Sequence, residues 1–64
     1  MVDSLTLYDT MFHKIRLVGI DGNTHEGEVI FYESEWDSGS NEAEIGFNGT
    51  WYKQSQIKSV EIID

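Results

Sequence analysis

The sequence predicts an all-β domain, a small five-stranded antiparallel barrel with a short N-terminal helix or arm. Apolar and polar residues alternate in several short runs, which is the period of a β-strand. Asp-Gly and Asn-Gly pairs lie between these runs and are typical of tight turns. The chain has only 64 residues, which is too few for a sandwich of two large sheets. We therefore expect a single domain over residues 1–64, with residues 13–63 forming the barrel.

Residues 1–12 leave two alternatives open. Asp3 or Ser4 can serve as the N-cap of a helix, but Leu5 and Leu7 also alternate with polar neighbours as they would in a strand. We expect a short helix or an arm packed on the barrel. In a helix, one face would carry Val2, Leu5, Tyr8 and Phe12.

The next two segments predict a pair of strands joined by a tight turn. Residues 13–20 alternate and end at the turn residues Asp21-Gly22. In the strand that follows, Gly27 marks a bulge, a bend or a close approach of another segment. Residues 29–32 are apolar at every position, so we expect them to be covered on both faces. A strand of this kind could bend and serve two sheets of a small barrel.

The second half of the chain predicts a loop, a hairpin and a last strand. Residues 33–42 are polar and lack periodicity, which indicates a loop. Asn48-Gly49 is a strong signal for a hairpin with a type I′ turn. Residues 54–56 suit a single helical turn, and residues 57–63 a last strand. The turn would pair Phe47 with Thr50, Gly46 with Trp51, Ile45 with Tyr52 and Glu44 with Lys53, so that Trp51 covers Gly46 on the outer face.

Several of these residues resemble the Sm and Sm-like family, most closely its small, uncharacterised bacterial members. The resemblance covers about residues 13–63 and implies an SH3-like or Sm-like barrel. It also implies RNA binding in the lumen of a ring of subunits. The residues that support it are Asp21, Gly22, Gly27, Tyr32 and the segment from Tyr52 to Ile57.

The RNA-binding motifs of that family are altered in this chain. The Asp-x-aromatic-x-Asn segment would match Glu33, Glu35 and Asp37, and the aromatic residue is displaced to Trp36. The family's Arg-Gly motif would fall on Lys53-Gln54, where the charge is kept and the glycine is not. Carboxylates at these positions would repel phosphates. We therefore extend the fold of the family to this chain and not its RNA site.

The composition favours a cytoplasmic, non-catalytic protein. Twelve acidic and four basic residues give a net charge of −8, which disfavours nucleic acid and anionic membranes and favours basic partners. There is no cysteine, and no apolar run approaches the length of a membrane span. The two histidines, His13 and His25, have no catalytic context, and Asp37–Glu42 lacks the pattern of a calcium loop. We expect no catalytic residues, no metal and no cofactor.

Two functions remain as alternatives. The first is a protein-interaction module, either an adaptor or a DNA-mimicking inhibitor, that presents an acidic, tryptophan-bearing surface to a basic protein. The second is an Sm-like RNA-binding protein that acts as a ring, although we expect a monomer or homodimer. Trp36 would be exposed in the first case, or would fold back and plug one end of the barrel. The predicted partner-binding residues are Glu33, Glu35, Trp36, Asp37, Glu42 and Trp51.

Overall fold

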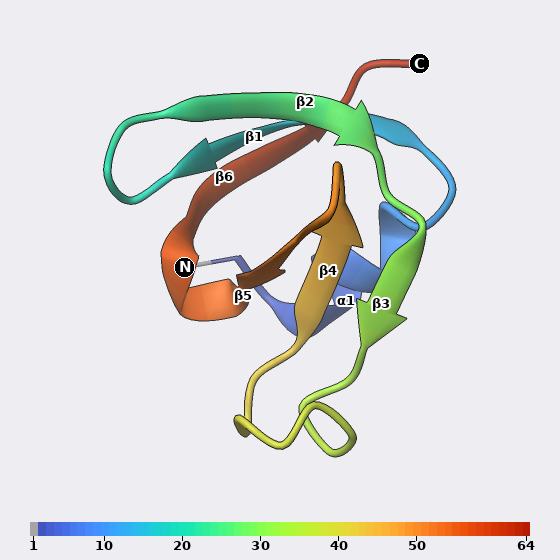
Figure 1. Ribbon diagram of the computed structural model, residues 1–64, viewed down its shortest axis with the longest axis vertical. Coiled ribbons are helices and arrows are strands. Elements are labelled where there is room, and N and C mark those ends of the chain that lie inside the picture. The colour runs from blue at the N-terminus through green and yellow to red at the C-terminus, as the bar shows by residue number, and fades with distance from the viewer. Residues whose placement is uncertain (1) are drawn as a thin grey trace.

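The computed structural model describes residues 2–64, so the first residue of the predicted 1–12 segment lies outside it. Within this range the chain forms one short helix, six strands and a single 3₁₀ turn (Figure 1). The elements are α1 Ser4–Asp9, β1 Lys14–Gly19, β2 Thr24–Glu28, β3 Phe31–Glu33, β4 Glu44–Phe47, β5 Thr50–Lys53, η1 Gln54–Gln56 and β6 Ile57–Ile62.

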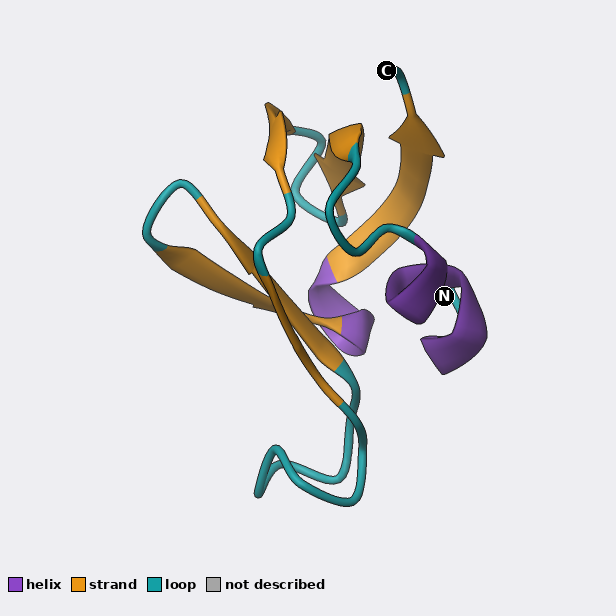
Figure 2. Cartoon of the chain, turned by 90° about the vertical axis from the view of Figure 1, so that its right-hand side faces the viewer, coloured by secondary structure: helices purple, strands orange, loops and turns teal. Residues whose placement is uncertain are grey.

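The strands are arranged in two antiparallel sheets of three strands each, with the orders β2-β1-β6 and β3-β4-β5. In Figure 1 the long, curved strands of the first sheet lie above the short strands of the second, and α1 lies behind β4. Figure 2 shows the same two groups of strands from the side, with the helix packed next to them. The shared core consists of Leu7, Ile15, Leu17, Val29, Ala43, Ile45, Phe47 and Ile57.

The prediction of a five-stranded closed barrel is wrong. The expected central strand is divided into β2 and β3, because two consecutive residues between them bond to different segments. The Val29 amide donates to the carbonyl of His13, which precedes β1, whereas the Ile30 amide donates to the carbonyl of Gly46 on β4. Among the described residues, β6 pairs only with β1 and β5 only with β4, so the two sheets do not close into a barrel.

The prediction that residues 29–32 are covered on both faces is also wrong. Val29 is fully buried, but Ile30 and Phe31 expose 48% and 53% of their surface. The reason is the same change of partner, because the chain leaves the first sheet at Val29 and becomes the edge strand of the second. One apolar run therefore supplies both a core residue and an exposed aromatic face.

Of the two alternatives for the N-terminal segment, a helix or an arm, the structure shows the helix. Asp3 is its N-cap, since its Oδ1 accepts a hydrogen bond of 2.7 Å from the Thr6 amide. Hydrogen bonding from the side chain and then the amide of Thr6 lowers the pKa of Asp3. The face predicted to be apolar is not the buried one. Leu7 is fully buried, whereas Leu5 and Tyr8 expose 67% and 58% of their surface.

The β4–β5 hairpin has the predicted register. Its four residue pairs match the expectation, and Asn48 and Gly49 have φ angles of +54° and +75°, as a type I′ turn requires. Ile45 and Phe47 point into the core, and Trp51 lies over Gly46 on the outer face. The predicted helical turn that follows the hairpin is also present, as η1.

Candidate partner-binding face

The outer face of the β3-β4-β5 sheet carries two cross-strand rows of side chains. Residues directly opposite each other in antiparallel strands point to the same side, so the register decides which side chains share this face. We call it the aromatic-acidic face. Its aromatic row consists of Phe31, Gly46 and Trp51, and its charged row of Glu33, Glu44 and Lys53.

The aromatic row is an exposed pair of rings over a glycine. The centroids of Phe31 and Trp51 are 5.5 Å apart, and their planes are inclined by 31°. Gly46 makes this arrangement possible, because a Cβ at that position would lie only 3.1 Å from the Cβ of Phe31. Trp51 still exposes 45% of its surface. Beside it lies a hollow of about 130 Å³ without a charged lining residue, formed by Ile30, Phe31, Gly46, Phe47, Gly49, Thr50 and Trp51.

The charged row is dominated by carboxylates. Glu33 and Glu44 are half-buried, and Glu44 Oε2 accepts a hydrogen bond of 2.8 Å from Ser40 Oγ. Lys53 lies opposite Glu44 in the register, but the ion pairs found in residues 2–64 involve only His13 with Asp64 and Arg16 with two glutamates. The charged row therefore presents more negative than positive charge next to the two rings.

The loop between β3 and β4 continues the charged row and extends below both strands in Figure 1. Trp36 lies in this loop and exposes 86% of its surface, so the alternative in which it plugs the fold is wrong. The turn around it is closed by hydrogen bonds from the Asp37 amide to the Ser34 carbonyl, 3.1 Å, and from Ser34 Oγ to Asp37 Oδ2, 3.2 Å. Trp36 belongs to none of the aromatic pairs within the described chain.

The carboxylate of Glu42 is not free for a partner, because it is hydrogen-bonded to the backbone of η1. Its Oε1 accepts a hydrogen bond of 2.7 Å from the amide of Ser55 in η1, and its carbonyl accepts one of 2.6 Å from Ser38 Oγ. The bond from Ser55 lowers the pKa of Glu42. The structure therefore places Glu33 and Trp51 on the face and Glu35, Trp36 and Asp37 in its loop, and uses Glu42 to hold that loop against η1.

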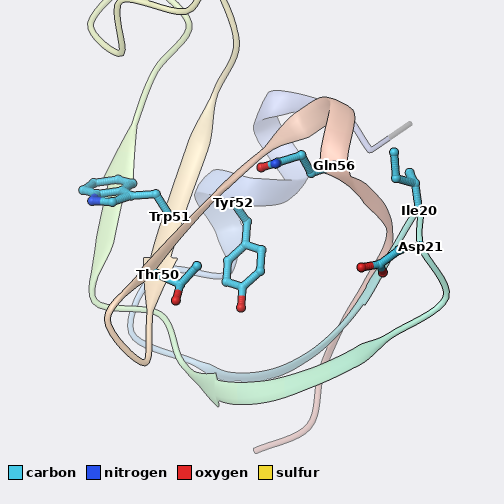
Figure 3. A pocket seen from close by; sticks show the side chains of 6 residues that line it. All are labelled: Ile20, Asp21, Thr50, Trp51, Tyr52 and Gln56. Carbon is cyan, nitrogen blue, oxygen red and sulfur yellow. The ribbon is translucent and has the colours of Figure 1, made fainter.

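A second hollow, of about 240 Å³, was not predicted. It lies between the β1–β2 turn and β5, where the two sheets diverge (Figure 3). In the sequence, Asp21 belongs to a predicted turn and Tyr52 to a predicted hairpin. They line the same hollow through the tertiary structure alone, because they are far apart in the chain. The residues that line the hollow are Ile20, Asp21, Thr50, Trp51, Tyr52 and Gln56.

Residues 2–64 contain neither a cluster of metal ligands nor a membrane-spanning helix. This part of the chain contains no group of three or more His, Cys, Asp or Glu residues that could hold a metal ion. It also contains no helix with the length and apolar character needed to cross a membrane.

Comparisons with protein-family models, with curated proteins and with solved structures give no match to this chain. The resemblance to the Sm-like family therefore stays a prediction from the sequence. The candidate function rests on the geometry of the described residues.

Proposed function

We propose that this chain is a non-catalytic protein-interaction module that binds a basic protein through the aromatic-acidic face and its loop. The observation that supports it is Trp36, which exposes 86% of its surface between two acidic neighbours, Glu35 and Asp37. Tryptophan is among the residues that most often dominate the binding energy of protein interfaces. If this chain is an adaptor, the partner is the protein that it recruits. If it is a DNA-mimicking inhibitor, the partner is a nucleic-acid-binding protein.

The exposed rings have the character of interface anchors. Phe31 and Trp51 form a preformed aromatic pair on a sheet, whereas Trp36 lies on a loop beyond it. Aromatic residues at the centre of an interface and charged residues at its rim are the usual arrangement of a specific protein contact. Glu33, at the edge of the sheet, would belong to the rim.

The charge of the chain supports a basic partner. Twelve acidic residues oppose four basic ones, and Arg16 is already engaged by Glu26 and Glu61 at 2.9 and 3.2 Å. A field of this sign accelerates the approach of a basic surface and slows that of a nucleic acid. We propose further that the chain acts as a monomer or homodimer in the cytoplasm.

The experiment begins with capture of proteins from a lysate of the source organism, with and without nuclease, followed by kinetics on the purified partner. Trp36→Ala should speed dissociation, because it removes an anchor. Glu35→Gln combined with Asp37→Asn should mainly lower the association rate and weaken its salt dependence.

The matched control is Asp9→Asn combined with Glu28→Gln, which removes the same charge from α1 and β2. Its association rate should exceed that of the loop variant. If Trp36→Ala and the loop variant both bind as the wild type does, the surface proposed here is not the interface.

A further inference from the structure

We propose that the hollow between the β1–β2 turn and β5 receives an arginine side chain of the partner. This inference rests on the proposed function, since it names the group that a basic protein would insert. Among residues 2–64, Asp21 is the only charged residue that lines the hollow, and Tyr52 supplies an aromatic wall. In Figure 3 the carboxylate of Asp21 points toward Tyr52 across the open space, whereas the ring of Trp51 lies on the other side of β5.

The carboxylate of Asp21 is held in a fixed orientation. Its Oδ1 accepts a hydrogen bond from the Asn23 amide and its Oδ2 one from Asn23 Nδ2, both of 3.0 Å. Each carboxylate oxygen has two acceptor positions, so each oxygen can accept one further hydrogen bond. The backbone bond from Asn23 also lowers the pKa of Asp21, which keeps the group charged at neutral pH.

The ring of Tyr52 is also held in place by its neighbours. Phe47 stacks on Tyr52, with ring centroids 5.0 Å apart and planes inclined by 26°, and His25 lies 5.4 Å from Tyr52. A guanidinium placed over an aromatic ring is attracted by the negative face of that ring. The hollow therefore combines an aromatic side chain with an oriented carboxylate.

Arginine fits this hollow better than other cations. Its planar guanidinium can donate a hydrogen bond from its edge and stack on a ring with its face, whereas a lysine ammonium acts as a point charge. A second copy of this chain is a poor source, because Arg16 is held by ion pairs with Glu26 and Glu61. A basic partner with an exposed arginine is the occupant that the charge of −8 favours.

The test is an NMR titration of the amide signals with a peptide of alternating arginine and glycine. Peptides with lysine or citrulline in place of arginine serve as probes of charge and shape. The arginine peptide should shift the amides of Asp21, Asn23 and Tyr52 and bind more tightly than the lysine peptide, and the citrulline peptide should not bind. Asp21→Asn should raise the Kd of the arginine peptide about fivefold, which is what the loss of one exposed charged pair contributes.

Asp21→Asn keeps an acceptor for the turn, because asparagine forms the same turn as aspartate. Its matched control is Asp9→Asn, which removes one charge from α1 and should bind as the wild type does. If the peptide shifts only the signals of Trp36 and its neighbours Glu35 and Asp37, and the two variants bind alike, the arginine site in the hollow is ruled out while the proposed function stands. Equal binding of the three peptides also overturns the arginine site, and no shift at either place contradicts both proposals.

Discussion

At the scale of single residues, Gly27 decides how closely the two sheets approach. A Cβ at this position would lie 2.7 Å from Cδ2 of Phe47 and 2.8 Å from Nδ2 of Asn48. Asn48 lies there because its Nδ2 donates a hydrogen bond of 2.8 Å to the Glu26 carbonyl on β2. Of the three alternatives predicted for Gly27, a bulge, a bend or a close approach, the structure shows a close approach, where the tip of the β4–β5 hairpin rests on β2.

Gly27→Val should lower the free energy of unfolding by about 2 kcal/mol or more, because the side chain would displace Phe47 from the core. Gly27→Ala should have a smaller effect of the same sign. Thr24→Val, on the same strand, should change stability by less than about 0.5 kcal/mol. Urea denaturation measures all three, and an unchanged midpoint for Gly27→Val would show that the hairpin does not rest on β2.

At the scale of elements, the long loop is held by polar contacts to η1. The Ser55 amide donates to Glu42, and the Ala43 amide donates to Gln54 Oε1 at 3.0 Å. Gln54 also reaches the N-terminal segment, where its Nε2 donates to the Val2 carbonyl at 2.9 Å. These bonds, together with the buried Ala43, anchor the end of the loop next to β4, while Trp36 stays exposed.

The Glu42 contact predicts a dependence of stability on pH. The bond from Ser55 lowers the pKa of Glu42 below its ordinary value of 4.5. Its contribution is therefore complete above about pH 4.5 and is lost as the pH falls through the lower folded-state pKa. Glu42→Gln keeps an acceptor but no longer titrates, so its urea midpoint should fall less between pH 6 and acid than that of the wild type.

Glu28→Gln is the control for this measurement. Glu28 lies exposed on β2, and its side chain makes no hydrogen bond within the described part of the chain. It should keep the pH dependence of the wild type. Identical pH profiles for Glu42→Gln and the wild type would mean that the carboxylate does not stabilise the fold through Ser55.

At the scale of the whole molecule, charge and short sheet edges both act against assembly into a ring. The net charge of −8 would be multiplied and concentrated by ring closure. β5 has four residues and is followed at once by η1, so it offers little edge to a neighbouring subunit. Among the described residues, no strand pairing joins β5 to the first sheet.

We expect a monomer or a dimer in dilute solution, to be measured by size-exclusion chromatography with light scattering. Oligo-uridine should not be shifted in a gel at physiological salt, because the carboxylates at Glu33, Glu35 and Asp37 repel phosphates. A hexamer or heptamer that shifts oligo-uridine would favour the RNA-binding alternative over the proposed interaction module.

The sequence by itself determined the local features of this protein. The β4–β5 register was predictable because Asn48-Gly49 sets a two-residue turn, and the turn alone decides which residues face each other. The turn at η1 and the cap at Asp3 could be predicted for the same reason, since each depends on neighbours a few residues away. The outer position of Trp51 then followed from the period of a strand.

The tertiary structure alone decided how these local elements are joined. The division of the apolar run after Gly27 depends on the partners of two amides, His13 for Val29 and Gly46 for Ile30, and both partners are distant in sequence. That division separates the two sheets and leaves Phe31 exposed beside Trp51. The tertiary structure also places Asp21 across a hollow from Tyr52. Strand periodicity describes one chain segment at a time, so it could predict neither the break nor the pairing of these side chains.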